Sequence, residues 1–220
     1  MRGQPREPIV GGPAAQTGAS GAGAFPGRGL LALAWSKYTQ ELHRRPLKTK
    51  CITAACVAAF SDLVAQAITS GGLPKNWRRT LAVACFGFLY TGPSAHFWQT
   101  LMEWLFAGRK DFQSVLLKVF VDQMTYGPFC NILFMSFATL VLEGRPVAVL
   151  QQKIARDYPG VQLYGWRLWP LAALINYRFV PLQFRVLFIN VVSFIWTTFL
   201  LLKAKRAQAL LVVAAKSGAD

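Results

Sequence analysis

Five polar side chains inside long apolar stretches are the residues of this sequence best placed to do chemistry. They comprise two carboxylates, one imidazole and two amides, namely Asp62, Gln66, His96, Asp122 and Asn190. Because a polar side chain costs free energy in lipid, one that remains in an apolar segment usually faces a protein interior, a partner or water. A carboxylate and an imidazole within reach of each other could relay protons, and several such groups could line a hydrated path. We therefore treat these five as candidate pore-lining residues.

The spacing of these residues places them on particular helix faces. Asp62 and Gln66 are four residues apart, which puts both side chains on one face of a helix. The same kind of spacing recurs in two further runs, which are His96, Thr100 and Glu103, and Asn190, Ser193 and Thr197. Such polar faces have two interpretations: hydrogen bonds that hold a helical bundle together, or the lining of a hydrated path. The sequence leaves both open.

A lysine bears on the charge of such a path. A pore lined by carboxylates would favour cations or small neutral solutes over anions. Lys118 lies four residues before Asp122, close enough on a helix to neutralise it. If the two side chains pair, the preference for cations shrinks, and passage is governed by the width of the path.

No catalytic motif accompanies these residues. The sequence contains no G-x-S-x-G, H-E-x-x-H, phosphate-binding Walker loop or dinucleotide fingerprint, and its glycine-rich run, "GASGAGAFPG", lies in a low-complexity segment. The cysteines form no C-x-x-C pair and stand in apolar surroundings, where packed thiols are expected: Cys51, Cys56, Cys85 and Cys130. We expect no enzymatic activity, no cofactor and no metal site.

The composition assigns the chain to a membrane class. Of its 220 residues, 54% are apolar and only 15% are charged, and the mean hydropathy is positive, whereas about 25% of the residues of a soluble domain are charged. The net charge of +15 comes from basic clusters between apolar blocks, such as "HRRPLKTK" and "KAKR". This placement favours lipid headgroups over nucleic acid as the partner.

Four apolar segments are long enough to cross a bilayer, at about residues 51–74, 80–102, 119–142 and 185–203. They predict an all-α integral membrane protein, with a membrane domain over residues 35–206, four transmembrane helices, short interfacial helices and both termini on one side. Small residues at Cys51, Ala55 and Ala59 would let the first helix approach a neighbour closely. Gly87 with "TGPS" in the second segment, and "YGP" in the third, predict kinks.

The stretch "WPLAALINYRFVPLQFR", from Trp169 to Arg185, is too interrupted by polar residues to be a span. Its aromatic residues favour an interfacial or half-inserted helix, and Pro181 should break that helix and start the next one near Leu182. Arg185 is then expected at the level of the headgroups.

Both ends of the chain have the composition of tails. Residues 1–34 are rich in Gly and Ala, contain basic residues and bury too little apolar surface to fold, so they are expected to be a disordered tail or an organelle presequence. Residues 207–220 form a C-terminal tail.

Several motifs, in order, resemble the peroxisomal membrane protein twenty-two family, whose animal mitochondrial inner-membrane relative is called Mpv-seventeen. They are "YTQELHRRPLKTKCITA", "SDLVAQ", "RRTLAVACFGFLYTGPSAHFW", "KVFVDQMTYGP", "ARDYPGVQL" and "WRLWPLAALINYRFVPLQFRVLFINVVSFIW". The similarity runs from about Trp35 to Arg206, and the wording is nearest to the plant and algal peroxisomal branch.

The resemblance implies a four-span protein of the peroxisomal membrane, related to weakly selective channels that support organelle redox homeostasis. It also implies targeting by an internal basic cluster, here His43, Arg44, Arg45, Lys48 and Lys50, which would equally serve as the charged flank of the first span. The long N-terminal tail departs from the family pattern and leaves the mitochondrial inner membrane or a plastid membrane as alternatives. Expected partners are the lipid bilayer, small water-soluble metabolites or ions, and further copies of the chain; a non-conducting structural or partner-binding protein is the alternative function.

Overall fold

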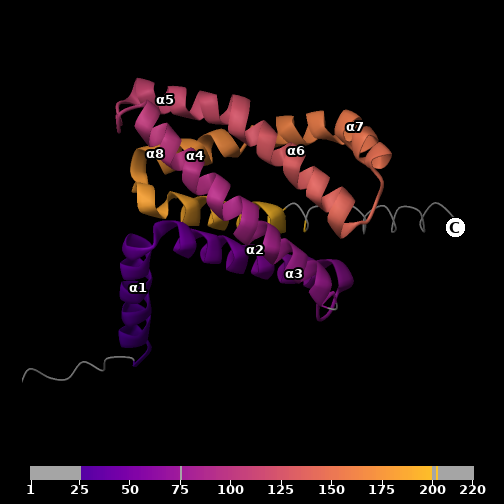
Figure 1. Cartoon of the computed structure of the whole chain (residues 1–220), viewed down its shortest axis with the longest axis horizontal. Coiled ribbons are helices and arrows are strands. Elements are labelled where there is room, and N and C mark those ends of the chain that lie inside the picture. The colour runs from indigo at the N-terminus through magenta and orange to yellow at the C-terminus, as the bar shows by residue number, and fades with distance from the viewer. Residues whose placement is uncertain (1–25, 75, 200–201, 203–220) are drawn as a thin grey trace, which may run out of the picture. The chain divides into compact units, whose positions relative to one another are not determined.

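The computed structural model describes residues 26–74, 76–199 and 202, which are helical apart from short connections and contain no β-strand (Figure 1). The predicted all-α class is confirmed. The chain divides into two units, Met1–Tyr38 and Thr39–Asp220, and the arrangement described below is that of the second unit.

The N-terminal helix, α1 (Pro26–Arg44), begins earlier than the sequence predicted. Proline at the first position suits a helix start, because that N–H has no partner within the helix. Residues 26–34, assigned to a disordered tail, are therefore helical. The rest of that tail, residues 1–25, and the C-terminal tail lie outside the described residues, so the presequence remains a prediction.

The first apolar segment forms α2 (Pro46–Ser70), which starts about one turn before the predicted span. It too has proline in its first turn, and it ends at Gly71, whose φ of 69° is the left-handed conformation that glycine adopts without strain.

The next two segments each form a long helical run, with one π-helical turn in the first and two in the second. The first run comprises α3 (Trp77–Phe86), η1 (Gly87–Thr91) and α4 (Gly92–Leu105). The second comprises α5 (Phe112–Val121), η2 (Asp122–Tyr126), α6 (Gly127–Phe137) and η3 (Ala138–Leu142). Figure 1 shows the first run crossing α2.

The π-helical turns η1 and η2 lie at the two places where the sequence predicted kinks. Each ends immediately before a Gly-Pro pair, and the glycine N–H bonds to the carbonyl five residues back: Gly92 to Gly87, and Gly127 to Asp122. A proline inside a helix lacks an N–H and its ring crowds the carbonyl four residues back. One wider turn before each proline accommodates that crowding, and π-helical turns of this kind bend helices.

The close packing of α2 against the run Trp77–Leu105 depends on Gly87 and Gly92. A Cβ on Gly92 would lie 2.6 Å from Cys51 Cα, and one on Gly87 would lie 3.0 Å from Ala55 Cα. The prediction that small residues of the first span permit close approach is thereby confirmed for Cys51 and Ala55.

After α7 (Val147–Gly165), the stretch that begins at Trp169 folds as its prolines predicted. It forms α8 (Trp169–Phe179), a break at Val180 and Pro181, and the 3-10 turn η4 (Leu182–Phe184), which leads into a helix that the structure describes to Phe199. That terminal helix, Leu182–Phe199, contacts α2 through the rings of Phe194 and Phe60, whose centres are 5.3 Å apart.

Three described helices are long and apolar enough to cross a membrane: Pro46–Ser70, Phe112–Leu142 and Leu182–Phe199. The other predicted span, residues 80–102, lies within the run Trp77–Leu105, whose central sequence "YTGPSAH" makes it less apolar. The count of four spans remains a prediction.

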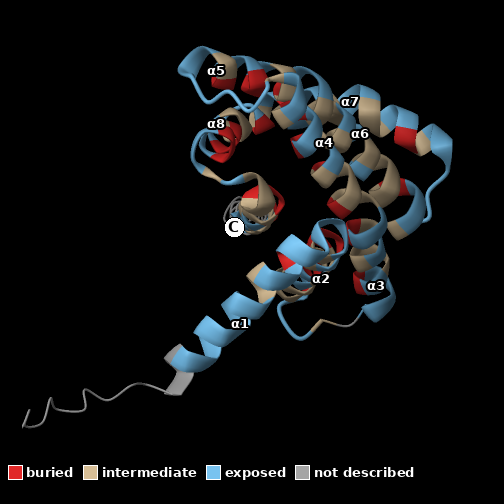
Figure 2. Cartoon of the chain, turned by 60° about the vertical axis from the view of Figure 1, so that its left-hand side comes forward, coloured by how far each residue is buried: buried red, intermediate tan, exposed pale blue. Residues whose placement is uncertain are grey.

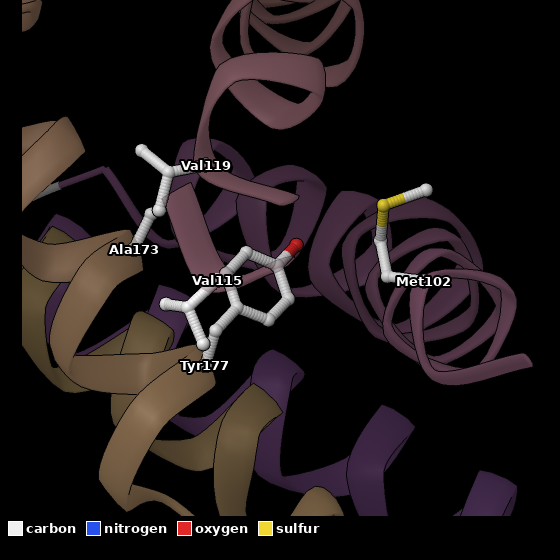
Figure 3. Close-up of a cluster of buried hydrophobic side chains, with 5 residues drawn as sticks. All are labelled: Met102, Val115, Val119, Ala173 and Tyr177. Carbon is white, nitrogen blue, oxygen red and sulfur yellow. The ribbon is translucent and has the colours of Figure 1, made fainter. Parts of the chain in front are cut away.

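Burial follows the pattern of a helical bundle with an apolar exterior. Large apolar side chains such as Phe60, Leu89 and Phe120 are more than half exposed, as lipid-facing residues would be. Figure 2 shows buried residues where helices face one another. One apolar cluster joins α4, α5 and α8 through Met102, Val115, Val119, Ala173 and Tyr177 (Figure 3). The remaining buried positions include many polar side chains.

Candidate functional site

Asp62 and Gln66 form a hydrogen-bonded corner between α2 and α3. Gln66 Nε2 donates to Asp62 Oδ2 at 2.7 Å and to Thr80 Oγ1 at 2.9 Å, and the Thr80 hydroxyl donates to the same carboxylate oxygen at 2.7 Å. Arg79 Nε lies 2.9 Å from the other oxygen, Oδ1. The backbone of Asn76 closes the corner, since its N–H donates to Gln66 Oε1 and its C=O accepts from Gln66 Nε2. The polar atoms of the Asp62 and Gln66 side chains are thus engaged in holding two helices together.

Glu103, near the end of α4, is the centre of a second cluster. Its Oε2 lies 2.8 Å from Arg185 Nη1 and 3.5 Å from Lys118 Nζ, and both cations are almost completely buried. Lys118 also donates to the Arg109 carbonyl at 2.9 Å, and Arg185 Nε donates to that of Val180 at 3.1 Å. One carboxylate therefore serves two buried cations that come from different helices.

Lys50 adds a third buried cation beside this cluster. Its Nζ lies 3.1 Å from His96 Nδ1, and its charge interacts electrostatically with that of Arg185. Lys50 is only 3% exposed, so this member of the predicted targeting cluster faces the protein interior, whereas His43, Arg44, Arg45 and Lys48 are exposed. We call Lys50, His96, Glu103, Lys118 and Arg185 the basic cluster.

Asp122 forms a third polar group, between α4, η2 and α8. Its Oδ1 accepts from Trp98 Nε1 at 2.7 Å and from the Tyr177 hydroxyl at 3.1 Å, and its Oδ2 accepts from Gln123 Nε2 at 3.0 Å. The ring of Trp98 stacks on Tyr126 with the ring centres 4.8 Å apart. All three donors to the carboxylate are neutral.

Three buried amides have side-chain atoms that make no hydrogen bond within the described part of the chain. They are Gln99 Oε1 on α4, both side-chain polar atoms of Asn176 on α8, and Asn190 Nδ2 on the terminal helix. Two of them share a helix with a member of the basic cluster, since Gln99 falls between His96 and Glu103 and Asn190 is five residues after Arg185. An unpaired buried polar atom costs about 1–3 kcal/mol, and such atoms are usually satisfied by water or a ligand.

The five candidate pore-lining residues are therefore distributed over three places. The structure brings Asp62 and Gln66 together at the corner, His96 into the basic cluster, and Asp122 against Trp98 and Tyr177, while Asn190 is buried with an unpaired amide nitrogen. A surface pocket of about 520 Å³ is lined by Val149, Gln152, Lys153, Ala155 and Arg156 of α7 and by none of the five.

Two expectations about charged residues were wrong. Lys118 pairs with Glu103 and not with Asp122, because Asp122 begins the π-helical turn η2 and faces Trp98 and Tyr177. Arg185 is not placed to reach headgroups, since it is 1% exposed and held by a carboxylate 82 residues earlier in the chain. Spacing along one helix could not identify Glu103 as the partner of either cation, because Glu103 lies on a different helix from both.

Two acidic residues outside the spans have partners close to them in the sequence. Asp111 caps α5 by accepting from the Ser114 N–H at 2.9 Å, and this bond is the main cause of the lowered pKa of Asp111. The side chain of Arg156 lowers the pKa of its neighbour Asp157 in the same way.

The four cysteines differ in how far they are buried. All four cysteines are free; Cys51 is buried and Cys130 partly buried, but Cys56 and Cys85 are exposed, so the expectation of packed thiols is wrong for those two. Within the described residues, no group of three His, Cys, Asp or Glu side chains could hold a metal ion.

Comparison with known proteins places these features in a family. The model of the Mpv17 / PMP22 family matches residues 140–201. The chain is 38% identical to the peroxisomal membrane protein PMP22 of Arabidopsis thaliana over 82% of this chain and 94% of that protein. It is 30% identical to bovine (Bos taurus) peroxisomal membrane protein 2, over 82% and 92% of the two chains, and 31% identical to the mitochondrial inner membrane protein Mpv17 of Caenorhabditis briggsae, over 76% and 91%. No solved structure matches.

The names of these relatives agree with the expected location, a peroxisomal membrane with the mitochondrial inner membrane as the alternative. The identity to the Arabidopsis protein extends over nearly its whole length, and the family model covers the break at Pro181 and the terminal helix Leu182–Phe199. The chain belongs to the Mpv17 / PMP22 family of peroxisomal and mitochondrial membrane proteins.

Proposed function

We propose that this chain provides a weakly selective path for small water-soluble solutes across an organelle membrane, without enzymatic activity. The observation that carries the proposal is the set of buried amide atoms without a hydrogen-bond partner in the described chain, on Gln99, Asn176 and Asn190, in a bundle whose buried residues also include Lys50, Lys118 and Arg185. In a bundle with an apolar exterior, buried polar groups without a partner lower the stability of the fold unless water or solute reaches them. A bundle that crosses the membrane four times, with further copies of the chain as neighbours, is the arrangement we propose for it.

The corner at Asp62 favours a second function. Its hydrogen bonds and its ion pair are made within the protein, as in a scaffold whose polar residues only hold helices together. A non-conducting membrane protein that binds partners or lipid would need nothing more. In the first function the unpaired amides contact water or solute, and in the second they do not. A substitution at Asn190 distinguishes the two functions.

We expect Asn190→Leu to fold, because leucine keeps the branched shape of the side chain and removes an amide nitrogen that has no partner within the described chain. If a hydrated path passes Asn190, the same substitution should reduce single-channel conductance in planar bilayers severalfold. The matched control is Thr197→Leu, an exposed position on the same helix, which should leave conductance unchanged.

The outcomes of this experiment distinguish the two functions. Discrete openings in the wild type that shrink in Asn190→Leu and persist in Thr197→Leu support the path. A silent bilayer, from protein shown to be folded and inserted, refutes the path and favours the scaffold.

A further inference from the structure

The charges of the basic cluster do not balance. Lys50, Lys118 and Arg185 are each 3% exposed or less, while the one carboxylate of the cluster, that of Glu103, contacts Lys118 and Arg185, and Lys50 contacts the neutral ring of His96. Arg185 interacts electrostatically with both lysines. Buried charges are costly unless they are paired, so three cations around one carboxylate form an environment that favours an additional anion.

The three cations lie near the beginnings of three helices. Lys50 lies in the second turn of α2, Lys118 in the second turn of α5, and Arg185 directly after η4 at the start of the terminal helix. The beginning of α2, the loop between α4 and α5, and the turn between α8 and the terminal helix lie on one side of the unit (left in Figure 1). The C-termini of α4 and α8 end in the same connections, so the partial charges of the helix ends offset one another and the positive charge of the cluster comes from its side chains.

Hydrogen-bond donors are also available near this place. Lys50 Nζ has three donor positions, of which the contact with His96 uses one, and the Asn190 amide nitrogen is buried without a partner within the described chain. Amines, guanidinium groups and amide N–H groups are the donors that bind carboxylate and phosphate oxygens. The donors required by an oxyanion are therefore present together with the charge.

We propose that the basic cluster binds a small oxyanion, a carboxylate or phosphate group, at Lys50 and Arg185. The inference rests on the proposed path and specifies the solute class that enters it, namely anionic metabolites. It reverses the preference for cations expected from the sequence, because Asp62 is paired with Arg79 and Asp122 lies among neutral donors away from this group.

Binding of inorganic phosphate to the full-length protein in phosphatidylcholine nanodiscs, at constant ionic strength, tests the site by calorimetry. We expect saturable binding by the wild type and at least about tenfold weaker binding by Lys50→Met, which removes one charge-assisted contact. Lys48→Met, at an exposed position two residues away, is the control and should bind as the wild type does. Lys50→Gln, which keeps a polar group beside His96 without the charge, provides a second variant should Lys50→Met fold poorly.

Absence of saturable binding by the wild type, or equal binding by the two Lys50 variants and Lys48→Met, would overturn the proposal. Nanodiscs that contain phosphatidic acid identify the source of the oxyanion: competition with phosphate indicates a lipid headgroup, and undiminished phosphate binding indicates a free solute. Because binding is measured without flux, a protein that conducts but does not bind phosphate refutes only this site. A protein that binds phosphate but never conducts refutes only the path.

Discussion

Glu103→Gln is expected to lower the free energy of unfolding by about 3–5 kcal/mol, the usual cost of removing one partner from a buried ion pair. The substitution keeps the size of the side chain but leaves Arg185 and Lys118 buried without a counter-charge. Thermal unfolding in detergent micelles, followed by circular dichroism, measures the effect.

The control for this prediction uses the same substitution at an exposed pair. Glu143 lies 2.6 Å from Lys153 Nζ, but both side chains are 30% exposed or more, so Glu143→Gln should cost at most about 1 kcal/mol. Replacing both Glu103 and Arg185 by leucine should recover part of the loss, since Arg185 is then no longer a buried cation without a counter-charge. Equal melting temperatures for Glu103→Gln and Glu143→Gln would show that the basic cluster is not buried as described.

Gly92→Ala is expected to destabilise the protein by about 1–3 kcal/mol, or to prevent folding, because the added methyl group would lie 2.6 Å from Cys51 Cα. The obstacle is backbone, so α2 as a whole would have to move away from α4. A lower melting temperature and earlier-eluting, aggregated material in size-exclusion chromatography are the expected observations.

Gly127 provides a control in nearly the same local sequence. It also precedes a proline and follows a π-helical turn, but a Cβ there would meet only the Asp122 carbonyl oxygen of its own helix, at 3.4 Å. Gly127→Ala should therefore be tolerated. If the two alanine variants were equally stable, the close contact between α2 and α4 would be contradicted.

Local features of the fold could be predicted from the sequence because local chemistry determines them. The break before Leu182 follows from the fixed geometry of Pro181, and the bends at Gly92 and Gly127 follow from the prolines that come next. The prediction of a kink did not specify a π-helical turn, since a proline crowds the preceding turn without determining how the helix relieves it.

The basic cluster could not be predicted in the same way. Glu103 and Arg185 are 82 residues apart, and which helix places a carboxylate beside that arginine depends on packing that no spacing rule contains. An arginine near the end of a span is expected to extend its side chain to the headgroups only when the protein offers it no partner. The Lys118–Asp122 pairing failed for a related reason, because Glu103 of another helix competes for the lysine.

The pairing of Asp62 with Gln66 was within reach of the sequence, since both lie on one face of a single helix. Their partners Arg79 and Thr80 come from the next helix, so the change from a candidate pore lining to a helix corner required the structure.

The central claim, that solutes pass through the polar interior beside the basic cluster, is tested most directly by the accessibility of Gln99 to a charged thiol reagent. In a background with the four native cysteines replaced by alanine, Gln99→Cys should react with the anionic reagent methanethiosulfonate ethylsulfonate, and its conductance in planar bilayers should fall. Leu101→Cys, at an exposed apolar position on the same helix, should give no change. A conducting Gln99→Cys protein that the reagent leaves unaffected would contradict the account, because the solutes would then cross by another route.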